Sequence, residues 1–350
     1  MEQEKTRKKN KGLRLTVKII MTIVLVVVLL LALVKVGERL FFTPFYSNAN
    51  AEFKIPGLSE GYIPQGLELY SVTNEDDTVT DYFLACGYMN NKSASRVYLL
   101  DTNGNVLSQT YLKKVNKEGE LVDYTGHTGG LCVNYEKGLV YISGSGGLDI
   151  FKLSDIVNPQ ISDATLVGTF KVSDKVDPAY CKINGDYIYT GSFHHAGPYD
   201  TDEKQHFVTP NGDSNMSVLL KYKLDSTSEF GIGNLEAVYS TPSYVQGIAF
   251  ANDKLILSCS WGLSISKLYI HDLGKVHSYN VKAPTESWGE GVSLYYVDSA
   301  SNTETISAPP MAEEIVYYSD RIWIMNESAC NKYIFGKFTS GNYLYSYWLH

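Results

Sequence analysis

The chain has 350 residues, of which 13% are aromatic, with 27 tyrosines, and its formal net charge is −8. Because phosphate binding needs a basic face, this acidic balance excludes a nucleic acid as the expected partner. The tyrosine content favours strands over helices, so the part after the N-terminal segment reads as either one large all-β domain or two smaller domains.

The first eighteen residues are rich in lysine and arginine and precede an apolar run. Residues 19–34 carry no charge, and Val17 and Val36 extend the apolar length. Lys18 and Lys35 are long enough to reach the membrane surface from its ends. We therefore predict a transmembrane anchor at residues 19–36. The basic cluster places residues 1–18 in the cytoplasm and the remainder outside, as a single-pass protein of the cell membrane.

A cleaved signal peptide is the alternative to an uncleaved anchor. Ala49-Asn50-Ala51 has the small-x-small form of a cleavage site. It lies about fifteen residues past the apolar run, which is too far for ordinary cleavage. The sequence thus predicts a juxtamembrane stalk at residues 37–51 and an extracytoplasmic domain at residues 52–350.

One motif recurs five times in that domain. A pair of residues opens a short apolar strand, a tight turn follows, and a second strand is rich in Tyr, Ile and Leu. The opening pairs are Gln65-Gly66, Gly129-Gly130, Ala179-Tyr180, Gln246-Gly247 and Glu313-Glu314. Successive pairs start 64, 50, 67 and 67 residues apart. A weak repeat of short strands at this spacing is typical of a β-propeller.

We predict an all-β propeller of five blades with four strands each. Residues 93–101 match residues 264–272 in residue type, and Asn103-Gly104 is a strong hairpin signal. Six blades are the alternative, because residues 291–297 are also strand-like. In the fifth repeat, residues 321–325 form the expected second strand and residues 332–335 the third. The short strand at residues 52–55 is predicted to supply the missing outer edge and so close the ring.

Five cysteines are scattered through the domain without a CxxC pair. They are Cys86, Cys132, Cys181, Cys259 and Cys330. An odd count without close spacing argues against a disulfide framework and against a zinc site. We expect small, buried, apolar side chains in or near strands. No metal site is predicted, and the sequence names no cofactor.

The Pro-Gln-Gly opening, His127-Thr128-Gly129-Gly130 and the segment at residues 309–313 resemble those of uncharacterised bacterial exported or membrane-anchored propeller proteins. The Gln-Gly-Leu opening is also similar to five-bladed plant-type glutaminyl cyclases, and more distantly to lactonase-like and strictosidine-synthase-like propellers. The resemblance runs from about Tyr62 to the C-terminus. Lactonase-like propellers hold a metal in a ring of Glu, Asn and Asp, and Gln65, His127 and Gln246 depart from that pattern.

The residues that open the innermost strands of a propeller gather at one end of its central channel. Convergent polar groups in a concavity form the default site hypothesis. We predict His127 as a general base, with Glu313 or Glu314 orienting it or acting as an acid. The remaining openings supply three candidate ligand-binding residues: Gln65, Tyr180 and Gln246. The alternative is a scaffold role, in which these residues satisfy backbone groups left open by the closing blades.

Two further segments are candidates for ligand binding. His194 and His195 begin an insertion that runs to about Met216, and it reads either as a lid or binding loop or as a solvated connector. Adjacent residues point apart on a strand, so the two histidines make a poor metal pair. Trp261 ends a second strand, where its ring would stack on a sugar or a peptide, or simply pack.

Two function classes remain. The favoured one is a membrane-tethered propeller that binds a cell-envelope ligand, either a glycan, a peptide or a protein, at the channel mouth. The alternative is an extracytoplasmic enzyme of the cyclase or hydrolase kind, with His127 and Glu313 in acid–base roles. Gly57-Leu58-Ser59-Glu60-Gly61 has the Gly-x-Ser-x-Gly form. It lies between two expected strands, whereas a nucleophile elbow joins a strand to a helix. Cys181 has no adjacent activating residue. The absence of a nucleophile at a strand-to-helix elbow therefore favours the binding module over the enzyme.

Overall fold

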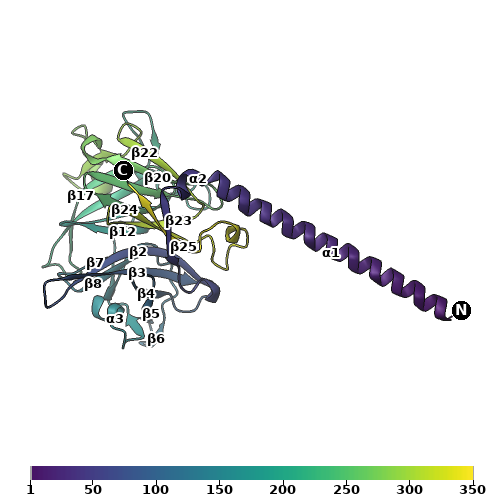
Figure 1. Cartoon of the computed structure of the whole chain (residues 1–350). Helices are drawn as coiled ribbons and strands as arrows, with labels where there is room; N and C mark the ends of the chain where they lie inside the picture. Colours follow the sequence, from purple (N-terminus) through teal and green to yellow (C-terminus); the bar gives the residue numbers. More distant parts are fainter. Residues whose placement is uncertain (1, 350) are drawn as a thin grey trace.

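The computed structural model describes residues 2–349 as one long helix attached to a β-propeller (Figure 1). The helix α1 (Glu2–Phe41) projects away from the propeller. Its segment Gly12–Phe41 is long and apolar enough to cross a membrane: its most apolar 18 residues have a mean hydropathy of 3.2, and none of them is buried by the propeller. An apolar helix without a protein partner is the form that a bilayer-spanning segment takes.

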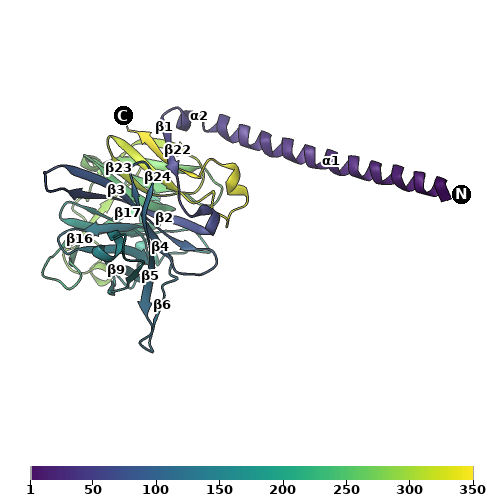
Figure 2. The same cartoon turned by 60° about the horizontal axis from the view of Figure 1, so that its bottom comes forward.

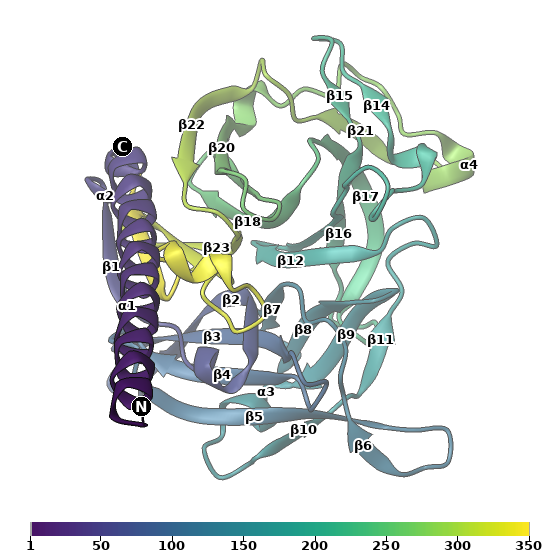
Figure 3. The same cartoon turned by 90° about the vertical axis from the view of Figure 1, so that its right-hand side faces the viewer.

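Five antiparallel sheets surround a common centre, which confirms the five-bladed prediction (Figure 3). From the centre outward, blade 1 contains β2 (Tyr62–Thr73), β3 (Val79–Met89), β4 (Arg96–Asp101) and β5 (Val106–Val115). Blade 2 contains, in the same order, β7 (Leu131–Asn134), β8 (Leu139–Gly144), β9 (Gly147–Lys152) and β11 (Gly168–Phe170). Blade 3 contains β12 (Pro178–Asn184), β13 (Tyr187–Ser192), β16 (Ser217–Leu224) and β17 (Ile232–Thr241). Blade 4 contains β18 (Val245–Ala251), β19 (Lys254–Cys259), β20 (Ser266–Asp272) and β22 (Asn302–Ala308).

Blade 5 combines the two ends of the propeller. Its strands are β23 (Ala312–Tyr318), β24 (Arg321–Asn326), β25 (Tyr343–Trp348) and β1 (Ala49–Lys54). Strand β1 pairs antiparallel with β25, and Phe53 is buried behind the pair. The predicted closure by a strand from the start of the domain is therefore confirmed. It leaves no open edge between the first and last blades.

The third strand of blade 5 lies elsewhere than predicted. Residues 332–335 are not a strand, and the pairing with β24 is made by β25 instead. The segment folds back in tight turns that end in η4 (Phe335–Phe338). A Cβ at Gly336 would lie 2.0 Å from the Ser328 carbonyl oxygen, so glycine permits this close return of the chain.

Additional strands extend two blades at their outer edges. Strand β21 (Ser293–Tyr296) pairs parallel with β17, so this strand-like segment enlarges blade 3 and does not form a sixth blade. In blade 1, β10 (Asp163–Thr165) pairs with β5, and β6 (Leu121–Asp123) makes a hairpin with β5 (Figure 2). The hairpin projects beyond the body of the propeller.

The hydrophobic core is divided into clusters that lie between neighbouring blades. One cluster joins blades 5 and 1 around Phe83 and Trp323, whose ring centroids are 4.8 Å apart. The others join blades 1 and 2, 2 and 3, 3 and 4, and 4 and 5. Each sheet thus buries both faces against its neighbours, as a single blade cannot do alone.

The junction between α1 and the propeller is packed. Residues 37–51, predicted as a stalk, contain the end of α1, the short helix α2 (Thr43–Tyr46) and the start of β1. Phe42 and Phe45 are buried against blades 4 and 5, and Phe45 stacks on Tyr347 with centroids 5.5 Å apart. The end of the helix is therefore fixed to the propeller by side-chain packing.

Candidate functional site

The opening pairs of the repeats form β-bulges where the inner strands begin. The pairing registers shift between Pro64 and Gly66, between Pro178 and Tyr180, between Val245 and Gly247, and between Ala312 and Ile315. A bulge inserts an extra residue and re-aims the side chains beside it. Four of the five opening pairs therefore form a β-bulge at one end of the channel.

The glycines of these openings allow the inner strands to approach one another. A Cβ at Gly130 would lie 2.3 Å from Oε2 of Glu314, and one at Gly247 would lie 2.5 Å from Cα of Glu314. A Cβ at Gly66 would lie 2.5 Å from Sγ of Cys86. No real side chain fits at such distances, so Gly130 and Gly247 leave the space that Glu314 occupies, and Gly66 leaves room for the Cys86 thiol.

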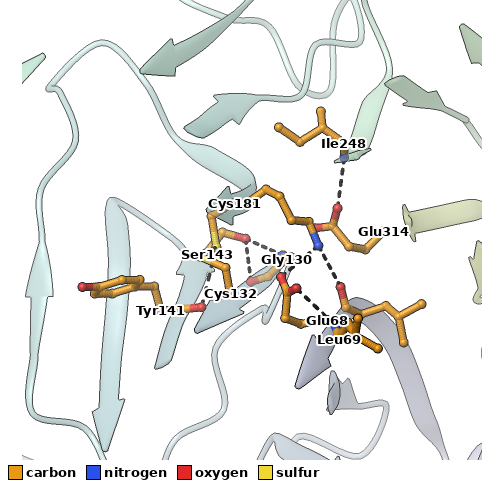
Figure 4. Close-up of polar contacts among 11 residues, drawn as sticks. Glu68, Leu69, Gly130, Cys132, Tyr141, Ser143, Cys181, Ile248 and Glu314 are labelled. Atoms are coloured by element: carbon orange, nitrogen blue, oxygen red, sulfur yellow. Dashed lines mark hydrogen bonds and ion pairs between the residues drawn. The ribbon is translucent and has the colours of Figure 1, made fainter. Parts of the chain in front are cut away.

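Three ionisable side chains meet inside the channel. Lys182 on β12 donates to Oε2 of Glu68 at 3.0 Å and to the Leu67 carbonyl oxygen at 3.1 Å. Glu314 on β23 approaches from another blade, and its Oε1 accepts a hydrogen bond of 3.0 Å from the Ile248 amide (Figure 4). One cation therefore lies among carboxyl groups from two other blades.

Burial shifts the titration of this axial group. Burial raises the pKa of Glu314 to about 8, although the charge of Lys182 opposes the shift. Burial also raises the pKa of Glu68, and its ion pair with Lys182 opposes that shift. Lys182 and Glu68 form the ion pair of the axis, and a Glu314 carboxyl that is protonated at neutral pH adds no second negative charge beside it.

The cysteines behave as small core residues. All five are buried and free, and Sγ of Cys132 lies 3.6 Å from Sγ of Cys181 between blades 2 and 3. Burial raises the pKa of Cys181 far above its ordinary value, and Cys132 beside it acts in the same direction. A thiol held neutral in this way is not a nucleophile. Their position agrees with the packing role expected from sequence.

A second acidic group lies at the channel mouth, the end where the inner strands begin. Nε2 of Gln65 donates to Oε2 of Glu327 at 2.8 Å, joining an opening pair to the loop after β24. Burial raises the pKa of Glu327 to about 7, against the charge of Lys332 and hydrogen bonds from Tyr333 and Gln65. The pKa of Glu313 is raised well above its ordinary value, mainly by burial and also by the neighbouring carboxyls of Glu327 and Glu314.

Glu313 has an unusual environment for a buried carboxyl. The residue is only 3% exposed. Among residues 2–349, no hydrogen bond or ion pair reaches its side chain. Its carboxyl oxygens are nevertheless not sealed from solvent, whereas Oε2 of Glu314 is buried without a partner. Its position at the mouth therefore leaves it available to a group that arrives from outside.

His127 lies at the rim of this mouth. Its ring packs on Tyr88 with centroids 4.9 Å apart, and Nζ of Lys332 donates to the Tyr88 hydroxyl at 2.7 Å. The residue remains open to solvent, but crowding by neighbouring atoms and the charge of Lys332 lower the pKa of His127. Its imidazole is thus neutral at neutral pH. Within the described part of the chain, no hydrogen bond joins His127 to either candidate glutamate.

An aromatic platform borders the mouth on the side of blades 3 and 4. It consists of Phe193, His195, Tyr199, Tyr244 and Trp261. The centroids of His195 and Trp261 are 4.2 Å apart, and those of Tyr199 and Trp261 are 5.6 Å apart. Tyr199 is 53% exposed and Trp261 is 37% exposed. Strands β13 and β19, which precede these rings, are antiparallel to the inner strands β12 and β18, so they end at the mouth.

Backbone hydrogen bonds under the platform hold the segments that carry these rings together. Tyr244 has φ 70, which a residue with a side chain rarely adopts. Its amide donates to the His194 carbonyl oxygen at 3.1 Å, and its own carbonyl oxygen accepts from the Ser260 amide at 3.0 Å. These bonds hold the start of the insertion against the loop that carries Trp261. Strained backbone of this kind is concentrated at functional sites.

The other sequence candidates lie apart from the open mouth. Tyr180 is fully buried in the core between blades 3 and 4. His194 is buried, and its Nδ1 lies 3.0 Å from the Thr201 hydroxyl, so it braces the insertion. His195 points the other way, onto Trp261. Gln246 is half-buried at its bulge, and Glu314 lies deeper than Glu313, at the axis.

Sequence reasoning missed Glu327, Lys332 and Tyr88 at the mouth. Glu327 and Lys332 belong to the segment whose end was predicted as a strand, which concealed their place in a loop. The available signal was the step from the apolar residues 322–325 to Asn326 and Glu327. A charge directly after a second strand falls at the same end of a blade as the opening pairs.

The channel mouth is distinct both from a metal site and from the apolar cavity of the propeller. Within residues 2–349, no group of three or more His, Cys, Asp or Glu side chains is placed to hold a metal ion. A cavity of about 240 Å³ lies between blades 3 and 4, lined by Asn184, Tyr189, Leu219, Tyr239, Phe250, Leu255, Leu273, Val276 and Tyr295. Asn184 ends β12, so this cavity lies toward the opposite end of the channel and is uncharged.

The fold and this mouth define a five-bladed β-propeller with an acidic channel mouth beside an aromatic platform. No family model and no curated protein matches the sequence. Among solved structures, the chain is similar to the glutaminyl cyclase of Myxococcus xanthus at 10% identity, with a TM-score of 0.39, covering 85% of this chain and 94% of that one.

Two further structures show the same kind of similarity. One is a nidogen/laminin complex, at 7% identity and a TM-score of 0.38, covering 76% of this chain and 73% of that one. The other is a putative 6-phosphogluconolactonase from Bacteroides uniformis, at 9% identity and a TM-score of 0.33, covering 74% and 63%. Similarity at this level supports no argument about activity.

Proposed function

We propose that the protein is a membrane-tethered extracytoplasmic propeller that binds a cell-envelope glycan at its channel mouth. The apolar helix α1 is the tether. The basic residues that precede it favour a cytoplasmic N-terminus, which places the propeller outside. This topology rests on the charge pattern and on the length of the apolar segment.

The observation that supports a ligand at the mouth is Glu313. A scaffold role would give this carboxyl a hydrogen-bond partner within the protein. None is found among the described residues, and its oxygens are accessible from the mouth. Its pKa is raised by burial and by Glu327. A hydroxyl or amide of a bound ligand would satisfy the carboxyl without demanding a second charge.

The aromatic platform favours a glycan over a peptide or protein. Exposed Trp and Tyr rings offer flat apolar faces with a polar edge, which suits the apolar face and hydroxyl rim of a sugar ring. Carboxyl and amide groups of Glu313, Glu327 and Gln65 lie nearby to orient the hydroxyls. A mostly aromatic surface with a few fixed polar groups is the usual form of a small-ligand site.

A binding titration of the full-length protein in detergent tests this proposal. The ligands are soluble peptidoglycan fragments and a neutral envelope polysaccharide, with an unstructured peptide for comparison. We expect glycan binding to weaken about tenfold or more in Trp261→Ala, the scale of a lost stacking contact. Trp348→Ala is the matched control, because Trp348 is 43% exposed and ends β25, away from the mouth. Equal affinities for wild type and Trp261→Ala, or binding of the peptide alone, would contradict a glycan site.

An extracytoplasmic enzyme of the cyclase or hydrolase kind is the second candidate. One observation favours it: a neutral imidazole at His127 and a carboxyl of raised pKa at Glu313 belong to the same mouth. Such a pair has the protonation states of a general base and a general acid. The two side chains are not hydrogen-bonded to each other, so binding remains the preferred function.

A further inference from the structure

The turn between β24 and β25 exposes two large apolar side chains. Ile334 is 73% exposed and Phe335 is 71% exposed, more than most apolar residues of the propeller. Exposed apolar groups gathered at one tip indicate a contact surface.

The turn is held in place and is not a loose tail. The Thr339 hydroxyl donates to the Gly336 carbonyl oxygen at 2.6 Å and lies 2.8 Å from Oγ of Ser328. Lys337 donates to Oδ1 of Asn331 at 2.5 Å across the same turn. The apolar tip is therefore presented by a folded support.

This turn lies beside the membrane helix. η4 and α1 are in contact, and α1 leaves the propeller on the side where η4 projects (Figures 1 and 3). The join is fixed by the burial of Phe42 and Phe45 and by Arg39, whose guanidinium lies 3.8 Å from the centroid of the Tyr46 ring. The turn therefore keeps a set position relative to α1.

The distance to the predicted bilayer is short. The apolar run ends near Val36, and the helix ends at Phe41, so the two points are separated by roughly 8 Å of helix. Leu40 and Phe41 are themselves more than 60% exposed, at 68% and 63%. Exposed apolar residues thus continue from the membrane span toward the turn.

The charges around the turn fit a lipid surface. Lys332 and Lys337 are exposed on it, and Arg39 lies at the end of α1. Basic side chains are attracted to the anionic headgroups of a lipid surface. Apolar side chains flanked by lysines are typical of segments that lie in the membrane interface.

We propose that the turn formed by residues 334–337 docks on the lipid surface, with Ile334 and Phe335 in the interface. The inference rests on the proposed membrane tether. Because Glu327 and Lys332 belong to the same β24–β25 connection, docking turns the channel mouth toward the membrane. The ligand taken at the mouth is then one that lies close to the bilayer, such as the membrane-proximal end of an envelope glycan.

An environment-sensitive label at position 335 tests this directly. The five native cysteines are buried, so Phe335→Cys offers one accessible thiol for a nitrobenzoxadiazole dye. The full-length protein is reconstituted into vesicles of phosphatidylcholine and phosphatidylglycerol. Val79→Cys is the matched control, because Val79 is 59% exposed at the start of β3, at the opposite end of the channel.

We expect blue-shifted emission at position 335 and loss of that emission with spin-labelled lipids, and neither effect at position 79. Co-flotation with vesicles, but identical unquenched emission at both positions, would overturn docking and leave the tether intact. Failure to float would overturn the tether and the docking together. A blue shift that appears only when another protein is added would identify a protein occupant and also overturn lipid docking.

Discussion

At the scale of single residues, the channel axis shows how a buried charge is balanced across blades. Lys182 pairs with Glu68 from blade 1, 114 residues away in sequence, while Glu314 from blade 5 shares the same space. Neutralising one of the two carboxyls by protonation removes the excess charge. This predicts a stability that depends on pH in a definite direction.

The free energy of unfolding should fall as pH rises from 6.5 to 8. Burial holds the pKa of Glu314 at about 8 in the fold, against an ordinary value of 4.5. Between these values the folded protein keeps a proton that the unfolded chain has released, so raising the pH favours unfolding. Glu327, with a pKa raised to about 7, acts in the same direction.

The window begins at 6.5 because buried His271 has the opposite effect below it. Burial lowers the pKa of His271 to about 4, so acid favours unfolding there. In urea titrations from pH 6.5 to 8, Glu314→Gln should remove about 1–2 kcal/mol of the decline, since one proton is worth about 1.4 kcal/mol per pH unit. An unchanged slope in Glu314→Gln would show that Glu314 is ionised throughout.

At the scale of elements, the closing strand β1 carries a separate prediction. A chain that starts at Gly61 lacks α1, α2 and β1, and leaves the edge of β25 unpaired. It also removes Phe53, a buried ring worth about 3–5 kcal/mol in comparable cores. Thermal unfolding should shift to lower temperature, and the open edge should promote aggregation.

The comparison for that truncation is a chain that starts at Gly37, which keeps α2 and β1 but lacks the membrane span. Both chains lose the anchor, so the difference between their melting temperatures reports residues 37–60, which contain α2, β1 and the short helix η1 (Leu58–Glu60). Equal melting temperatures and equal solubility would contradict the closure of the ring by β1.

A comparison of these elements with the sequence shows which parts of the fold the sequence could predict and which it could not. Strand patterns, tight turns and the match of residues 93–101 with 264–272 were enough to predict β4, β20 and the blade count. The opening motif was recognised, but the need for glycine at Gly130 and Gly247 comes from Glu314, which belongs to another blade. Such contacts join residues far apart in sequence, so no local pattern reports them.

The site was predicted less completely for the same reason. Glu313 and Glu314 are neighbours in sequence, yet the bulge between Ala312 and Ile315 leaves one at the mouth and the other at the axis. Glu327 was hidden because its loop was taken for the approach to a strand. Bulge and loop geometry depends on tertiary packing, which the residue pattern alone does not specify.

At the scale of the whole molecule, the two ends of the chain define one face. The ring is closed in blade 5, and α1 leaves from that blade on the side of η4 (Figure 1). The channel mouth, the aromatic platform and the apolar turn then share a face that we propose is turned toward the membrane. The account's central claim is that the mouth is kept for a ligand and not for the fold.

Chemical unfolding of Glu313→Gln tests that claim most directly, with exposed Glu304→Gln as the control. If Glu313 awaits a ligand, the amide places no charge beside Glu327 and no internal hydrogen bond is lost. The free energy of unfolding at pH 8 should then stay equal or rise, because functional polar groups are often costly to stability. A fall of about 1–3 kcal/mol, the usual cost of breaking a buried polar contact, would show a scaffold role and contradict the account.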